Sequence, residues 1–202
     1  MKKEMTSELV RGILHALLIV ITLAITLKTT AFLVFLFFVG VMIEVLTRLS
    51  PKIETWVYYS PLSPIRYITR PEEKSNKDIH AGFAVLSGML VSHLAFPNFF
   101  IPSVLVLAFA DPLARLAGQR LGAKKVLLRE RTYVGSATFF VSTLIILMLS
   151  TYPLLVSAVV AAIATLLELI SLPRPRCIIF LQDNFLIPVG VAFGLSLIPR
   201  FL

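Results

Sequence analysis

Hydrophobic residues fall into seven long runs along the chain, separated by short polar connections. Within each run they are continuous and do not alternate with polar residues, which favours helices over strands. Several runs approach the length that a helix needs to cross a hydrocarbon core of about 30 Å. The sequence therefore predicts an all-α fold, a polytopic membrane helix bundle of about seven transmembrane helices with these approximate limits: Leu9–Leu27, Thr30–Leu49, Ile79–Phe96, Phe99–Gly118, Tyr133–Ser150, Pro153–Leu172 and Asn184–Ile198.

The fourth and seventh predicted helices contain Pro112 and Pro188, respectively. A proline inside a helix removes one backbone donor and kinks or breaks the helix. Membrane helices tolerate such breaks where neighbouring groups satisfy the freed backbone atoms. We therefore expect broken or tilted helices at these two positions.

The composition agrees with a membrane protein, because 57% of the residues are hydrophobic and the mean hydropathy is +0.90. Both values lie above those of an ordinary soluble domain. The single cysteine, Cys177, excludes a disulfide framework and a cysteine-based metal site. We expect one integral membrane domain over residues 1–202, without an appended soluble domain.

The net charge of +8 is concentrated on one face of the predicted bundle. Of the 19 lysine and arginine residues, only Lys28 and Arg200 fall on the other face. Cytoplasmic connections of membrane proteins carry the excess of basic residues. We therefore expect a multi-pass protein of the cell membrane or an endomembrane, with a cytoplasmic N-terminus and an external C-terminus. The basic residues do not indicate a nucleic acid partner.

The longest predicted connection, residues 50–78, contains several aromatic residues among its prolines, including Trp56 and Tyr67. Such rings favour the headgroup layer, which suggests a cytoplasmic segment lying along the interface. The segment is either an ordinary amphipathic connector or faces the substrate.

Three carboxylates fall within the apolar runs: Glu44, Asp111 and Glu168. An ionised carboxylate near the middle of a membrane costs roughly 2.5 to 3.5 kcal/mol on insertion scales, so each needs a reason. Glu44 has Arg48 one helical turn later, and an ion pair between them is sufficient reason. Asp111 has Arg115 in the same relation, but Pro112 follows it directly. We expect the helix to open there to admit a ligand.

Further polar residues lie at the cytoplasmic ends of other predicted helices. Glu8, Arg11 and His15 share one stripe of the first helix, where His15 is either a packing residue or a functional one. Asp183 and Asn184 mark the start of the seventh helix, and Asn184 has the alternative role of a helix cap.

The connection at residues 118–132 is strongly basic and is either a topology determinant or a ligand site. Its cations are Arg120, Lys124, Lys125, Arg129 and Arg131. Carboxylates flank it, and Gly135 and Ser136 begin the next helix, where free backbone amides can hold a phosphate. Carboxylates for a divalent metal, together with cations for phosphate oxygens, are the groups that phosphoryl transfer requires.

Five sequence motifs occur in an order that resembles the CTP-dependent lipid alcohol kinases, a family that includes dolichol and polyprenol kinase, phytol and farnesol kinase, and the CTP-dependent diacylglycerol kinase. The motifs are "SELVRGILH", "RPEEKS" with "HAGFAVLSG", "ADPLARLAGQRLG", "RERTYVGS", and "LLE" with "DNFLIP". Two positions differ from the family pattern: Gly12 replaces a lysine and Val134 replaces a glutamate.

The resemblance implies transfer of the CTP γ-phosphate to a lipid hydroxyl, with Mg²⁺ or another divalent metal. Carried over by position, Asp111, Asp183 and Glu168 would hold the metal, and Asp111, Asp183 and His15 would be catalytic. Substrate contacts would come from Arg70, Glu8 and Arg11. The nucleotide would be bound by Arg115, Arg120, Lys124, Lys125, Arg131, Ser136 and Asn184.

An isoprenoid alcohol is the preferred acceptor, because most relatives act on isoprenols, and diacylglycerol is the alternative. A CTP:lipid-phosphate cytidylyltransferase would share the membrane geometry, but its usual G-H-G-G-x-x-D-R-x-D signature does not occur in the sequence. Outside enzymes, an ion-coupled transporter would also use intramembrane carboxylates. Against a transporter, the chain has no visible internal repeat.

Overall fold

A computed structural model describes residues 2–60, 81–122, 131–171 and 181–197, apart from the side chains of residues 2–9 and 11. Within these ranges the fold is all-helical, as predicted, and contains no β-strand. The elements are α1 (Lys2–Thr26), α2 (Thr30–Leu49), α3 (Pro51–Tyr59), α6 (Ala81–Ala95), the 3₁₀ turn η1 (Pro97–Phe99), α7 (Phe100–Leu105), the π-helical turn η2 (Val106–Ala110), α8 (Asp111–Leu121), α9 (Tyr133–Leu149), α10 (Leu154–Ile170) and α11 (Asp183–Leu197).

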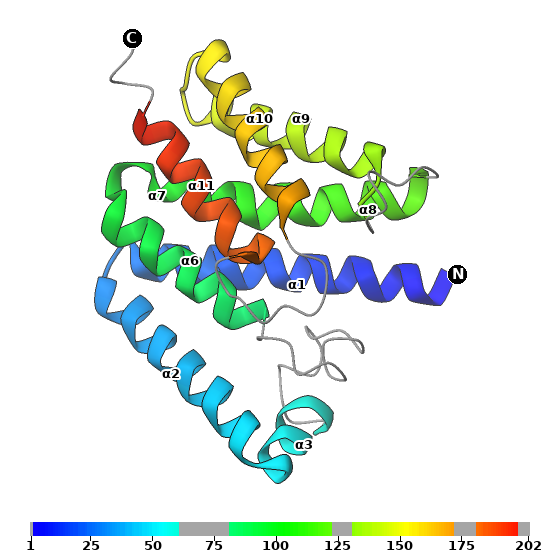
Figure 1. Cartoon of the computed structure of the whole chain (residues 1–202), viewed down its shortest axis with the longest axis vertical. Coiled ribbons are helices and arrows are strands. Elements are labelled where there is room, and N and C mark those ends of the chain that lie inside the picture. The colour runs from blue at the N-terminus through cyan, green and yellow to red at the C-terminus, as the bar shows by residue number, and fades with distance from the viewer. Residues whose placement is uncertain (1, 61–80, 123–130, 172–180, 198–202) are drawn as a thin grey trace.

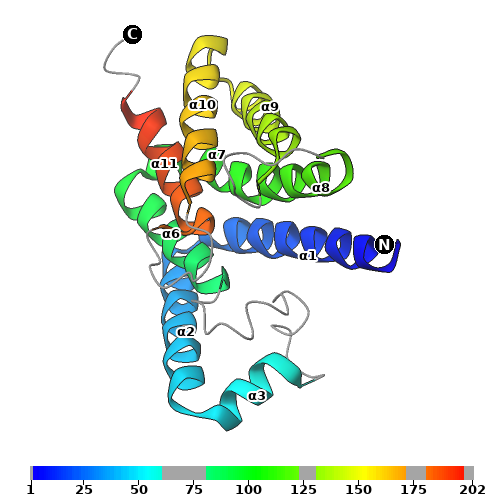
Figure 2. The same cartoon turned by 45° about the vertical axis from the view of Figure 1, so that its right-hand side comes forward.

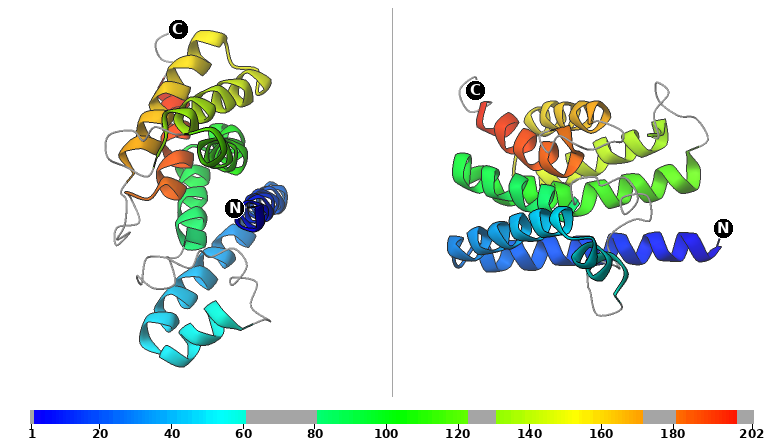
Figure 3. Two further views of the ribbon diagram at one scale, coloured as in Figure 1. Left: turned by 90° about the vertical axis from the view of Figure 1, so that its right-hand side faces the viewer. Right: turned by 60° about the horizontal axis from the view of Figure 1, so that its bottom comes forward.

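The central element is the long rod formed by α7, η2 and α8. It lies between α1 on one side and α9 and α10 on the other (Figures 1 and 3). Helix α11 packs against α6 and α10. Helix α2 packs against α6 and α1 and carries α3 at its far end (Figure 2).

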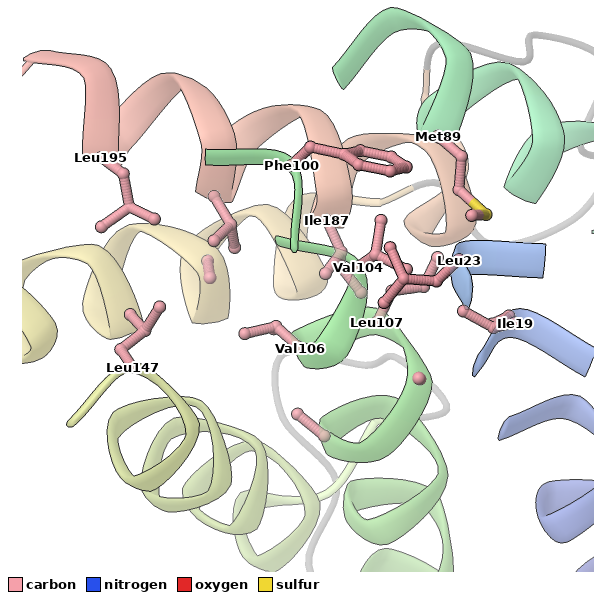
Figure 4. Packing of buried hydrophobic residues seen from close by; sticks show 14 of the residues in the cluster. Ile19, Leu23, Met89, Phe100, Val104, Val106, Leu107, Leu147, Ile187 and Leu195 are labelled. Carbon is pink, nitrogen blue, oxygen red and sulfur yellow. The ribbon is translucent and has the colours of Figure 1, made fainter. Parts of the chain in front are cut away.

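The hydrophobic core gathers around the middle of this rod (Figure 4). Val104, Val106 and Leu107 are fully buried there. They belong to one buried cluster with side chains from the surrounding helices, among them Ile19, Leu23, Met89, Leu147, Ile187 and Leu195. Burial of this apolar surface fixes the relative positions of the surrounding helices.

Small residues set the close crossing of α6 and α11. Gly88 is buried against α11, where a Cβ atom would lie 2.9 Å from Cγ of Pro188 and 3.0 Å from the carbonyl oxygen of Asn184. Ala84 and Ser92, on the same face of α6, are fully buried. This face of α6 therefore packs on a neighbouring helix.

A second close crossing joins α8 to α9. Ala114 and Gly118 are four residues apart and so share a face of α8, and Gly122 follows directly after the helix. A Cβ atom on Gly118 would lie 2.8 Å from Oγ1 of Thr132 and 3.5 Å from Cα of Gly135. These small residues bring the beginning of α9 against α8.

The helix does not open at Asp111 and Pro112 as expected. Pro112 lies in the first turn of α8, directly after the π-helical turn Val106–Ala110, and the chain stays helical throughout. The wider π turn accommodates a proline that lacks an N–H group for the preceding turn. The effect of Pro112 is therefore a local widening of a continuous helix.

Two helices are long and apolar enough to cross a membrane by length and composition: α2 and the rod from Pro97 to Leu121. They differ in their surroundings, because 17% of the α2 window is buried and 56% of the rod window is buried. Shorter apolar helices correspond to the other predicted spans: Gly12–Thr26, Ala81–Ala95, Tyr133–Leu149, Leu154–Ile170 and Asp183–Leu197.

The start of the predicted interfacial segment is the short helix α3. Val57 and Tyr58 are buried, whereas Trp56 and Tyr59 are more than half exposed. Residues 61–78 of that segment lie outside the described residues.

Candidate functional site

Three carboxylates that are distant in sequence come together beside the central rod, one from the rod itself and two from the ends of neighbouring helices. Asp111 is the first residue of α8, Asp183 is the first residue of α11, and Glu168 lies in the last turn of α10. Their exposed fractions are only 2%, 2% and 1%. Buried carboxylates require nearby positive charge or hydrogen bonds, because desolvation disfavours the ionised form.

The common partner of the three carboxylates is Arg131, two residues before α9. Its Nη2 lies 2.6 Å from Oδ2 of Asp183, and its Nη1 lies 2.8 Å from Oε1 of Glu168. The same Nη1 is 3.9 Å from Oδ1 of Asp111. The planar guanidinium therefore forms two short bridges and one longer contact within a single cluster.

Arg115 supplies the second positive charge. Its Nη2 donates to Oδ2 of Asp111 at 3.3 Å, one helical turn along α8. The other oxygen of Asp111, Oδ1, is buried and accepts no hydrogen bond from the described residues. Asp111 is thus the least completely satisfied member of what we call the carboxylate cluster: Asp111, Arg115, Arg131, Glu168 and Asp183.

The start of α9 places Ser136 beside this cluster. The Ser136 hydroxyl donates to Oε2 of Glu168 at 3.5 Å. The backbone amides there are already used, because the amide of Gly135 donates to Oγ1 of Thr132 and the amide of Ser136 donates to the Thr132 carbonyl. The expectation that these amides are free to hold a phosphate is wrong in this conformation.

The position of Asn184 in α11 contradicts one of its two predicted roles, that of a helix cap. The helix begins at Asp183, so Asn184 lies inside the first turn and is not its cap. The amide of Asn184 donates to Oδ1 of Asp183 at 2.8 Å. This bond orients the Asp183 carboxylate, whose other oxygen faces Arg131.

Electrostatics hold Arg131 firmly in its charged form. Burial alone would lower the pKa of the Arg131 guanidinium, but the carboxylates of Asp183, Glu168 and Asp111 outweigh burial and raise that pKa above its usual range. Three carboxylates against two guanidiniums leave the cluster with one excess negative charge when all five groups are ionised.

The oxygen donors of the cluster fit a hard divalent cation by their chemistry, since Mg²⁺ prefers carboxylate oxygens. In this conformation, however, no group of three or more His, Cys, Asp or Glu side chains among the described residues is placed to hold a metal ion. Arg131 lies among the carboxylates instead. The unbonded Oδ1 of Asp111 is the donor most available to a cation.

The remaining predicted site residues do not all join the cluster. Arg120 is exposed at the end of α8, and His15 is half-buried on α1. Glu8 and Arg11 lie on α1, but their side chains are outside the described part of the chain. Arg70, Lys124 and Lys125 also lie outside the described residues.

The simpler interpretation of Glu44 is confirmed. Its Oε1 lies 2.6 Å from Nη2 of Arg48, one turn later on α2. Gly12 on α1 is one of the two positions that differ from the family pattern. It faces α8, where an added Cβ atom would lie 3.4 Å from Cβ of Pro112.

Sequence reasoning missed two features of the site. Arg131 was predicted only as a phosphate ligand, whereas it bridges the carboxylates. Thr132 was not singled out, although it caps α9 and packs against Gly118. A threonine three residues before Gly135 is a readable capping signal, but the contacts of Arg131 depend on the tertiary fold.

Comparison of this chain with family models, curated proteins and solved structures finds no match. The carboxylate cluster and the sequence motifs therefore carry the functional argument.

Proposed function

We propose that the chain is a multi-pass membrane kinase that transfers the γ-phosphate of CTP to the hydroxyl of a lipid alcohol. The observation that carries this proposal is the convergence of Asp111, Glu168 and Asp183 with two arginines in one buried cluster. These residues come from three separate motifs of the kinase resemblance. Their proximity is what a shared site for metal and triphosphate requires.

The distribution of apolar residues supports a membrane location. Helix α2 is strongly apolar, yet little of it is buried, and residues such as Phe35 and Phe38 are more than 60% exposed. The core helix of a soluble protein would bury this surface, and soluble proteins seldom leave large apolar patches in water. Lipid contact gives these side chains a suitable environment.

The directions of the helices support a cytoplasmic site. The first turn of α1, the last turn of α8 and the first turn of α9 lie on one side of the bundle, and the last turn of α11 lies on the opposite side (Figure 1). The first side carries Arg120 and Arg131. Because basic residues favour the cytoplasmic side, the proposed site faces soluble CTP.

The cluster residues have distinct roles in the proposed reaction. Arg115 and Arg131 bind phosphate oxygens, and the Ser136 hydroxyl offers a further hydrogen bond. Asp111, Glu168 and Asp183 would hold Mg²⁺, which when bound neutralises charge on the phosphates. Arg120, Lys124 and Lys125 add positive charge around the triphosphate, and Asn184 orients Asp183.

The chemical step joins the lipid hydroxyl oxygen to the γ-phosphorus. The bond from that phosphorus to the β–γ bridging oxygen breaks, which gives the lipid monophosphate and CDP. The hydroxyl proton passes to a base, for which Asp111 is our first candidate and His15 our second. A loose transition state asks little of this base.

An isoprenoid alcohol is the proposed acceptor, with Arg70, Glu8 and Arg11 near its hydroxyl end. The preference rests on the family resemblance alone. Diacylglycerol is the other acceptor to be tested.

The decisive experiment uses protein purified in detergent and CTP labelled either on the γ-phosphate or on the cytidine. We expect label on the γ-phosphate to appear on an added isoprenol, and cytidine label to stay in CDP. Cytidine label on a lipid phosphate would instead indicate a cytidylyltransferase. No lipid-dependent turnover with either isoprenol or diacylglycerol would contradict the kinase proposal and leave a transporter as the alternative to test by ion flux.

A further inference from the structure

In the carboxylate cluster, Arg131 lies among the same carboxylates that are proposed to hold a metal. Arg131 contacts all three carboxylates, at 2.6 Å, 2.8 Å and 3.9 Å. A cation that used the same oxygens would need the position from which Arg131 reaches them. The two positive groups therefore have overlapping sites.

The fit of Arg131 to the cluster is incomplete at Asp111. A guanidinium presents its N–H groups in one plane, so it serves two carboxylates well and the third at a longer distance. Oδ1 of Asp111 accepts no hydrogen bond within the described structure, and it lies next to Nη1 of Arg131 at 3.9 Å. A buried carboxylate oxygen without a donor favours a ligand of higher charge and no fixed plane.

We propose that Arg131 is an internal competitor of the divalent cation: it neutralises the cluster in the absence of metal and moves to the nucleotide phosphates when the metal enters. This inference rests on the proposed function for the identity of the anion that receives Arg131. It adds an exchange between two partners to the simple phosphate contact predicted for this residue.

The charges of the two states support this exchange. With Arg131 and Arg115 in place, three carboxylates keep one excess negative charge. If a divalent cation replaces Arg131, the cation and Arg115 together balance the three carboxylates. If Arg131 stays nearby after the metal binds, the site carries one excess positive charge, which a bound triphosphate would offset. Metal binding and nucleotide binding should therefore strengthen each other.

The test measures binding of Mn²⁺, used as a paramagnetic probe for Mg²⁺, to the purified full chain without nucleotide or lipid. We expect Arg131→Met to bind Mn²⁺ at least about tenfold more tightly than the wild type, since the competing charge is gone. Electron paramagnetic resonance of free Mn²⁺ gives the affinity. Mn²⁺ should also raise the melting temperature of this variant more than that of the wild type.

Two further variants keep the result interpretable. Arg131→Lys retains the charge but cannot form the two-pronged bridge, so its Mn²⁺ affinity should lie between those of the wild type and Arg131→Met. This variant also provides the answer if Arg131→Met does not fold. Arg48→Met removes a comparable ion pair on α2, outside the carboxylate cluster, and should leave Mn²⁺ affinity unchanged.

Equal or weaker Mn²⁺ binding by the folded Arg131 variants would overturn the exchange, and so would an equal gain in Arg48→Met. Because no CTP is present, these results are independent of the kinase assay. Tighter Mn²⁺ binding without any CTP turnover would uphold the competition and reject the proposed reaction.

Discussion

At the scale of single residues, two ion pairs with the same spacing have different surroundings. Glu44 with Arg48 and Asp111 with Arg115 are both acid–base pairs one helical turn apart. Only Asp111 also meets Arg131 and shares that partner with two other carboxylates. The tertiary environment therefore distinguishes the local ion pair of Glu44 and Arg48 from the pair of Asp111 and Arg115, which belongs to the candidate site.

This contrast provides a matched test of the proposed role of Asp111. We expect Asp111→Asn to lower lipid-dependent CTP turnover at least about 100-fold, because a neutral amide is a poorer ligand for a metal and for positive charge. Glu44→Gln should keep turnover within a few-fold of the wild type. Initial rates at saturating CTP, with melting temperatures as the folding control, check both. Near-normal turnover by Asp111→Asn would remove this residue from the site.

The sequence could identify the members of the site more easily than their connections. Asp111 and Glu168 stand out because carboxylates are costly in apolar segments, and Asp183 stands out because it marks the start of the last predicted helix. Arg131 lies in a basic connection whose charges all look alike in sequence, so its central position could not be inferred. Which side chain enters the cluster depends on the docking of α9 against α8 through Gly118 and Gly135.

At the scale of helices, glycine positions decide how closely neighbouring elements approach. Gly88 lies where α6 meets the beginning of α11, and Gly82 lies about two turns earlier, where an added Cβ atom would have no neighbour within 4 Å among the described residues. The two glycines belong to one helix but have opposite packing environments. They therefore separate the effect of crowding from that of helix propensity.

We expect Gly88→Ala to destabilise the protein by about 1–3 kcal/mol, since the new methyl group meets backbone atoms of Asn184 and Phe185 that cannot easily move. The displacement would also disturb Asp183 and lower turnover. Gly82→Ala should be neutral or gain roughly 0.5–1 kcal/mol from helix propensity. Thermal unfolding in detergent measures both changes. Equal stabilities of the two variants would contradict the close crossing.

The end of α9 offers a different glycine test. Thr151 has a φ of 70°, and the amides of Thr151 and Tyr152 donate to the carbonyls of Met148 and Leu147. This pattern is a Schellman motif, in which the residue with positive φ is usually glycine.

Thr151→Gly should therefore raise the free energy of unfolding by about 1 kcal/mol, because a β-branched residue is strained in this region. Thr165→Gly, inside α10, is the control and should lower stability. Destabilisation by Thr151→Gly would mean that the threonine side chain contributes more than the strain costs.

At the scale of the whole molecule, the helix limits follow the apolar pattern closely. The predicted segment Thr30–Leu49 coincides with α2, and the other apolar segments differ from the observed helices mainly at their ends. Apolar periodicity determines where helices form. The apolar pattern does not show how much of each helix is covered by its neighbours. For this reason α2 and the central rod look similar in sequence but differ in burial.

The proposed multi-pass topology predicts opposite accessibility at the two ends of the bundle. Leu121, at the end of α8, and Leu149, at the end of α9, are 72% and 80% exposed. In a Cys177→Ser background, a membrane-impermeant maleimide should label Leu121→Cys only from the cytoplasmic side of sealed vesicles. It should label Leu149→Cys only from the other side. Labelling of both from one side would contradict the topology.

The π-helical turn before Asp111 also has a consequence for rotational phase along the central rod. One additional residue in a turn rotates everything that follows by about 100° relative to an uninterrupted α-helix. Val104 can thus point into the core while Asp111 faces Arg131 and Gly118 faces α9. Removing one residue from 106–110 would leave each half of the rod with its own apolar face, but with the two faces out of alignment.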